Sequence, residues 1–253
     1  MKALLRAELL KLRSTRTTAG LLLATFALVP LTVATTVPHV GDENAPLSLD
    51  DPGLLAAAVG VSFGVPVVLV VLFGTLAFTQ EFRYGTVTST YLGEPRRKRV
   101  LVAKWLSLAL ASVVITAATL ALSVALGIAL IGSRDGDVTL AGHFWGVVAS
   151  AFVVMAAYSL IGVAIGALVR NQIAAVVGVL VWMLAVEQIV IPAFPAVGCW
   201  MPGGATNALF QLGPALSLDG KLLPPSVGGL VLVGYTAAAV LLTLVVTPRR
   251  DVL

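Results

Sequence analysis

Gln80-Glu81-Phe82-Arg83-Tyr84-Gly85-Thr86, followed after seven uncharged residues by Glu94-Pro95-Arg96-Arg97-Lys98-Arg99, is the most charged part of the chain. With Lys104, these stretches join two long apolar runs. A segment with so many charges is too costly to place in hydrocarbon, so it must lie in water at a membrane surface. The sequence therefore predicts a loop over residues 79–100 between two membrane-spanning helices, where a soluble partner can bind.

The composition indicates an integral membrane protein. Of 253 residues, 58% are hydrophobic and 11% are charged, and the mean hydropathy is +1.02. Globular domains average about 25% charged residues. We therefore expect an all-α integral membrane fold with one transmembrane domain over residues 1–253. The single cysteine, Cys199, excludes an intrachain disulfide and a CxxC motif.

Six apolar stretches reach the length of about 20 residues that a spanning helix needs. They are Ala19–Val37, Leu54–Phe78, Leu101–Ile131, Phe144–Leu168, Ile173–Phe194 and Val227–Val246. The third is long enough to tilt or to begin outside the membrane. Pro30, Pro66 and Pro192 lie within spans and are expected to kink them.

The N-terminal segment 1–17 is basic and partly amphipathic. Lys2, Arg6 and Arg13 share one helical face, but Glu8 and Lys11 interrupt the apolar one. Two interpretations stay open. The segment is either an elbow helix lying in the interface before the first span, or a basic flank that holds the N-terminus inside.

The basic residues predict the orientation. If the N-terminus is cytoplasmic, 14 of the 16 lysines and arginines lie on the cytoplasmic side, and only Arg134 and Lys221 lie outside. This matches the positive-inside rule in every loop. We therefore expect both termini and the 79–100 loop in the cytoplasm. The net charge of +4 needs no nucleic acid, because a basic rim facing anionic lipid explains it.

The segment 195–226 is apolar but broken by many glycines and prolines. No full span fits, although short pieces such as Thr206–Leu212 can form half-helices. Non-helical backbone at membrane depth is tolerated where protein or a wet cavity surrounds it. The segment is read as an external re-entrant or interfacial hairpin, with a plain external loop as the alternative.

Glu187 is the one carboxylate within a predicted span, in Trp182-Met183-Leu184-Ala185-Val186-Glu187-Gln188. A charged carboxylate at the bilayer centre costs about 2.5–3.5 kcal/mol on insertion scales. It is therefore protonated, paired or next to a wet cavity. It lies either on a translocation path or in an interhelical hydrogen bond to which Gln188 contributes.

Catalytic motifs are weak throughout the chain. The hydrolase pattern Gly60-Val61-Ser62-Phe63-Gly64 lies inside an apolar helix instead of a strand-to-helix elbow. Two histidines and one cysteine make a poor metal set. Gly220-Lys221 is followed by Leu222, so there is no P-loop. We expect no catalytic, cofactor-binding or metal-binding residue, and any ATPase must be another polypeptide.

The motifs resemble those of a known family. Glu81-Phe82-Arg83-Tyr84-Gly85-Thr86 and the later Pro95-Arg96-Arg97 run are similar to the E-x-R-x-G-T and P-R-R elements of ABC-2 class ABC transporter permeases. Ala7–Arg16, Gly166–Gln172 and Trp182–Glu187 are also similar to family segments. The resemblance implies six spans, external half-helices between spans five and six, and a coupling element after span two. It implies that the coupling residues are Glu81, Arg83, Tyr84, Gly85, Thr86, Pro95, Arg96 and Arg97.

The resemblance implies the transmembrane subunit of an ATP-driven exporter that forms half of a translocation pathway. Two copies of a cytoplasmic ATPase, which bind ATP and Mg²⁺, and a second permease subunit are the expected partners. The alternative is a stand-alone membrane protein. It is either a proton-coupled secondary transporter with Glu187 as its relay or a scaffold that transports nothing.

Overall fold

The computed structural model of this chain describes residues 2–36, 49, 51–94, 96–140, 142–213, 216 and 221–247. Within these ranges every regular element is helical, as the composition predicts. The elements are α1 (Lys2–Ser14), α2 (Arg16–Thr36), α3 (Leu54–Ser62), α4 (Gly64–Arg83), α5 (Thr86–Gly93), α6 (Arg97–Gly132), α7 (Phe144–Val169), α8 (Gln172–Val181), a π-helical turn (Trp182–Val186), α9 (Glu187–Ala193), α10 (Pro195–Gly198), α11 (Pro202–Leu209) and α12 (Pro225–Val246). Val37, Pro95, Gly220 and Arg249–Arg250, which carry parts of the predictions above, lie outside the described residues.

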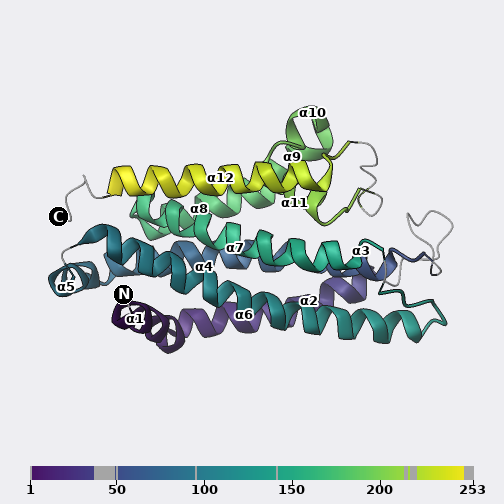
Figure 1. Cartoon of the computed structure of the whole chain (residues 1–253), viewed down its shortest axis with the longest axis horizontal. Helices are drawn as coiled ribbons and strands as arrows, with labels where there is room; N and C mark the ends of the chain where they lie inside the picture. Colours follow the sequence, from purple (N-terminus) through teal and green to yellow (C-terminus); the bar gives the residue numbers. More distant parts are fainter. Residues whose placement is uncertain are drawn as a thin grey trace.

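Six segments of the described chain are long and apolar enough to cross a membrane, which confirms the predicted number. They are Arg16–Ala34, Leu54–Arg83, Lys98–Gly132, Phe144–Val169, Gln172–Ala193 and Pro225–Val246. Figure 1 shows them as a bundle of roughly parallel rods. One end of the bundle, which we call the α5 end, holds α1, α5 and the C-terminal ends of α4 and α12 (Figure 1). The opposite end, the α11 end, holds α10 and α11.

The second span is interrupted near its proline. The helix breaks at Phe63, between α3 and α4, three residues before Pro66. Pro66 has no N–H to bond the carbonyl of Ser62, so the regular ladder fails there. At this break the Ser62 hydroxyl donates to the Val59 carbonyl over 2.7 Å and lies 2.7 Å from the Ser123 hydroxyl. The predicted distortion at Pro66 is therefore present.

α6 is longer than one span. Its 36 residues extend about 54 Å at 1.5 Å per residue, whereas the hydrocarbon core of a bilayer is about 30 Å thick. The N-terminal turns of α6 lie beside α1 and α5, at the α5 end. α6 is therefore longer than the bilayer core, and whether it tilts or begins outside the membrane stays a prediction.

The fifth span contains a π-helical turn, Trp182–Val186, between α8 and α9. The side chain of Gln188 donates to the Met183 carbonyl over 3.4 Å, inside the widened turn. Pro192 follows within α9. π-turns of this kind often accompany functional sites.

Between spans five and six the chain forms α10 and α11. α11 begins at Pro202, four residues before the predicted half-helix at Thr206, because proline at the first position favours helix initiation. α11 packs on α12 and also contacts α7 and α9. A half-helix is thus present, while its depth in the membrane stays a prediction. α1 is likewise helical and packs on α6, while its place in the membrane interface stays a prediction.

The backbones of α4 and α7 are in direct contact. A Cβ at Gly74 would collide with the Ser159 carbonyl oxygen, and one at Gly162 would collide with the Val71 carbonyl oxygen. Glycine is needed at both positions because the two backbones touch. Gly74 and Gly162 therefore have a packing role. Gly64 differs, since a Cβ there would meet nothing within 4 Å.

Candidate functional site

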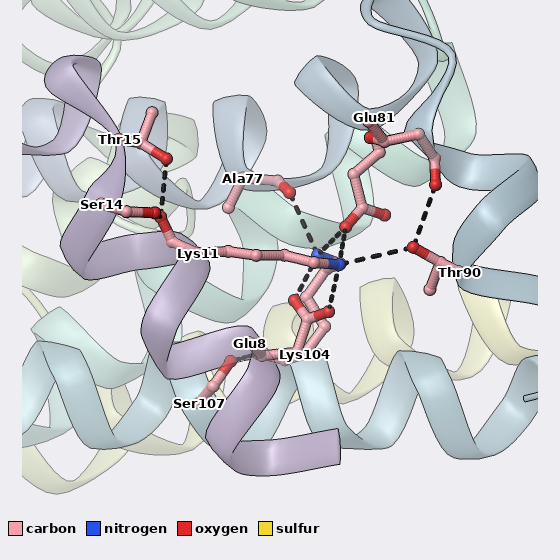
Figure 2. A network of polar contacts seen from close by, with 10 residues as sticks. Glu8, Lys11, Ser14, Thr15, Ala77, Glu81, Thr90, Lys104 and Ser107 are labelled. Carbon is pink, nitrogen blue, oxygen red and sulfur yellow. Dashed lines mark hydrogen bonds and ion pairs between the residues drawn. The ribbon is translucent and has the colours of Figure 1, made fainter. Parts of the chain in front are cut away.

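Four charged side chains from three helices meet at the α5 end, and we call them the ion cluster: Glu8 on α1, Lys11 on α1, Glu81 on α4 and Lys104 on α6. Lys104 Nζ lies 2.6 Å from Glu8 Oε2 and 3.0 Å from Glu81 Oε1. Lys11 Nζ lies 2.8 Å from Glu8 Oε1 and 2.7 Å from Glu81 Oε1. Figure 2 shows the two ammonium groups between the two carboxylates. Each cation therefore bridges both anions.

The ion cluster is buried on one side and open on the other. The exposed side-chain fractions are 2% for Lys104, 5% for Glu8 and 8% for Glu81, but 42% for Lys11. Lys104 also donates to the Ala77 carbonyl over 3.2 Å, and Lys11 to the Thr90 hydroxyl of α5 over 3.4 Å. Two positive and two negative charges balance. Burial of Glu8, Glu81 and Lys104 is tolerated because each is paired and hydrogen-bonded.

The cluster shifts two pKa values in opposite directions. Burial alone would raise the pKa of Glu8, but attraction by Lys104 and hydrogen bonds from Lys104 and Lys11 outweigh it and lower the pKa. Burial alone would lower the pKa of Lys11, but attraction by Glu81 and hydrogen bonds to Glu8 and Glu81 raise it. Both groups are therefore held in their charged forms.

Three members of this cluster were missed by sequence reasoning as site residues. Glu8 and Lys11 stood out only as breaks in the apolar face of the N-terminal helix. Lys104 was placed in the charged segment without a partner. The available signal was one carboxylate on an otherwise apolar helical face and one lysine after the start of an apolar run. Each such residue needs an opposite charge from elsewhere in the fold.

The predicted coupling residues at the turn between α4 and α5 are exposed, except for Glu81. Gly85 has φ +67° and precedes α5, so it supplies the left-handed conformation that the sharp turn requires. Part of the predicted 79–100 loop is thus the short helix α5, which itself carries no charge. Arg83, Tyr84 and Thr86 are exposed. Glu81, which the resemblance groups with them, is buried in the ion cluster instead.

The remaining predicted coupling residues lie at the start of α6. Arg96 precedes the helix and is exposed, and its backbone N–H donates to Glu94 Oε1 over 3.3 Å. Arg97 is the first residue of α6, but its side chain lies outside the described part of the chain, as does all of Pro95.

The last turn of α4 also bonds to other helices. Arg83 donates to the Gln172 side-chain oxygen at the start of α8 over 3.3 Å. Gln80 donates to the Thr17 hydroxyl of α2 over 3.1 Å. The Arg170 guanidinium lies 5.3 Å from the centre of the Phe82 ring. With the ion cluster, these contacts connect the end of α4 to α1, α2, α6, α8 and the α7–α8 turn.

The second candidate location is Glu187, near the α11 end. The residue is 3% exposed. Its Oε1 accepts hydrogen bonds from Trp182 Nε1 over 3.1 Å and from the backbone N–H of Gly203 over 3.0 Å. Gly203 lies in the first turn of α11, where a free N–H and the helix dipole favour an acceptor. The interhelical hydrogen bond predicted as one alternative is thus present, but Gln188 bonds to Met183 and not to Glu187.

The chemistry of both locations is that of charge and hydrogen bonding. Among the described residues, no group of three or more His, Cys, Asp or Glu side chains could hold a metal ion. The ion cluster can connect helices mechanically, and Glu187 can offer a carboxyl group to a cavity.

The comparisons with known proteins agree with the motifs. The family model described as ABC-2 family transporter protein matches residues 4–186, more than half of the chain. No curated protein matches the chain. The matched range contains the six-residue motif at the end of α4, the whole ion cluster and the π-helical turn. The chain therefore belongs to the ABC-2 transporter family and is a multi-pass membrane permease of the ABC transporter type, not itself catalytic.

Proposed function

We propose that this permease forms half of the translocation pathway of an ATP-driven exporter in the bacterial plasma membrane, with both termini in the cytoplasm. Two copies of a separate ATPase, which hold ATP and Mg²⁺, bind at the α5 end. A second permease subunit, identical or related, completes the pathway. The family membership and the distribution of basic residues support this assignment.

One observation carries the proposal. The α4–α5 turn has exposed apolar side chains, and its base, the end of α4, is bonded to several other helices. Tyr84 is 69% exposed and Leu92 is 80% exposed. At the end of α4, Glu81 forms ion pairs with Lys11 of α1 and Lys104 of α6. Arg83 donates a hydrogen bond to Gln172 of α8. A protein that binds α5 thus gains contact with a base that reaches three other helices, α1, α6 and α8.

This arrangement suggests how ATP-driven closure of the ATPase pair reaches the pathway. Displacement of α5 is transmitted to α1, α4 and α6 through buried charges that cannot separate cheaply. It reaches α8 through Arg83 and Gln172, and α8 leads into the π-helical turn and Glu187. The ATPase thereby shifts the balance between two arrangements of the spans, because it binds one of them better. We place Glu187 on the translocation path for this reason.

The docking role is tested at exposed residues of α5. The double variant Tyr84→Ser/Leu92→Ser removes two exposed apolar groups without touching the ion cluster. We expect at least tenfold less of a P-loop ATPase to co-purify from membranes of the source cell, because an interface aromatic often contributes 2 kcal/mol or more. The control Leu140→Ser lies before α7, near the α11 end, and is also exposed; it should leave co-purification unchanged.

Two outcomes would contradict the docking role. One is undiminished co-purification of the ATPase with Tyr84→Ser/Leu92→Ser. The other is transport by the purified chain alone in liposomes without nucleotide, which would instead support a secondary transporter with Glu187 as its relay. Charge reversal at Glu81 is a poor test of docking, because that side chain is buried and paired and its reversal would disturb the fold.

A further inference from the structure

A cavity of about 350 Å³ lies between α3–α4, α9 and α11. Its walls are mainly apolar, with side chains such as Val67, Val68, Met183, Ile191 and Phe210. A few polar groups also line it: Tyr158, Glu187, Gln188, Thr206 and Asn207. An apolar pocket of a few hundred Å³ with a small number of polar groups is typical of small-molecule sites.

The Glu187 carboxyl group in this cavity has no cationic partner among the residues that the structure describes. Of those residues, no lysine, arginine or histidine lines the cavity. All four ion pairs of the described residues belong to the ion cluster, so none involves Glu187. Both hydrogen bonds to Glu187 come from neutral N–H groups and end on Oε1. Oε2 accepts no hydrogen bond from any described residue. A buried carboxylate without a cationic partner is unfavourable, so a bound cation would supply what the fold lacks.

The other side chains that line the cavity indicate which class of cation fits it. The faces of aromatic rings such as those of Tyr158 and Phe210 attract organic ammonium groups. The apolar walls suit a hydrophobic body. A metal ion is a poor match, because Mg²⁺ and Ca²⁺ take six or more oxygen ligands, and the site offers one free carboxylate oxygen.

We propose that this cavity binds amphiphilic organic cations, molecules with an apolar body and one ammonium group that pairs with Glu187 Oε2. The inference rests on the proposed function, since it names the substrate class of the same pathway. It makes Glu187 the residue that selects charge, while the apolar walls accept bodies of different shapes.

Gly203 positions this carboxylate. A Cβ at Gly203 would lie 2.5 Å from Glu187 Oε2, so any side chain there must push the free oxygen aside. Gly178 on α8 offers the matched control, because a Cβ there would meet nothing within 4 Å. Both are helical glycines in or beside the fifth span, and only one touches the carboxylate.

Binding is measured on the purified chain in lipid nanodiscs without any ATPase. The probe is benzyltrimethylammonium, and its neutral isostere is neopentylbenzene, in which carbon replaces the charged nitrogen. We expect saturable binding of the cation, at least tenfold weaker in Glu187→Gln and in Gly203→Ala and unchanged in Gly178→Ala. Glu187→Gln keeps an oxygen for Trp182 and Gly203, so it should fold, and unchanged thermal unfolding checks this. Neopentylbenzene should bind wild type and Glu187→Gln alike.

Equal binding of the cation to wild type and Glu187→Gln would overturn the inference, as would equal affinity of wild type for the cation and its isostere. Either result would mean that Glu187 serves in helix packing and not in binding the cation. The assay needs no partner, so its outcome is separate from that of ATPase co-purification. If the chain binds the cation in nanodiscs but no P-loop ATPase co-purifies with the wild-type chain from membranes, the inference stands and the ATP-driven mechanism is rejected.

Discussion

The ion cluster and Glu187 place buried carboxylates in opposite surroundings. At the α5 end, Glu8 and Glu81 each contact two ammonium groups at 2.6–3.0 Å. Toward the α11 end, Glu187 is equally buried but receives only neutral donors. The first arrangement is complete within the chain and holds helices together. The second has no cationic partner among the described residues, and the proposed binding of an organic cation rests on this. Burial alone thus does not distinguish the two kinds of carboxylate, whereas their partners do.

The largest effect should come from removing one member of the ion cluster. Lys104→Met leaves two buried carboxylates with one half-exposed cation, and loss of one partner of a buried pair costs about 3–5 kcal/mol. The double variant Lys104→Met/Glu81→Leu should be less destabilised than Lys104→Met, because Glu8 and Lys11 then remain as a balanced pair. Thermal and denaturant unfolding in detergent measure both.

Lys98→Met is the matched control for this cycle, since Lys98 lies on the same helix but is exposed. It should change the unfolding free energy by less than about 0.5 kcal/mol. If the double variant is less stable than Lys104→Met, the four charges do not act as one balanced unit.

A smaller effect on stability is expected at Glu187. Glu187→Ala removes the acceptor of two buried N–H groups and should destabilise by about 1–3 kcal/mol. Glu187→Gln keeps an acceptor and should cost less than about 1 kcal/mol, well below Lys104→Met. A loss for Glu187→Gln as large as that for Lys104→Met would mean that its charge is paired within the fold, and the contrast between the two locations would disappear.

The smallest change should appear when the ion cluster is titrated near neutral pH. The lowered pKa of Glu8 gives stability that is present above the ordinary glutamate pKa and is lost as the pH falls through the lowered value. The raised pKa of Lys11 gives stability that is present below the ordinary lysine pKa and is lost as the pH rises through the raised value.

The stability difference between wild type and Glu8→Gln/Lys11→Met should therefore stay constant between about pH 6 and 9. It should shrink only at the acid and alkaline extremes. A difference that already varies between those limits would show that neither residue is held charged by the cluster.

Sequence reasoning predicted the spans well because hydropathy is a local property. The observed ends of α7 and α12 lie within two residues of the predicted ones, and α5 follows Gly85 as the turn chemistry requires. The partners of Glu8 and Lys104 could not be predicted, since they are 96 residues apart and only the packing of α1 on α6 brings them together. For Glu187, the hydropathy pattern predicted the location but not the neutral donors, because the backbone N–H of Gly203 carries no sequence signal.

The backbone contact between α4 and α7 has a mechanical consequence. Gly74 and Gly162 leave no side chain between the two helices, so neither can bend or rotate without displacing the other. α4 bears Glu81 in its last turns and Val67 of the cavity wall in its first, about 20 Å apart at 1.5 Å per residue. The pair is thus a stiff unit that extends from the ion cluster to the cavity beside Glu187, so a small tilt of α4 at one end also moves the other.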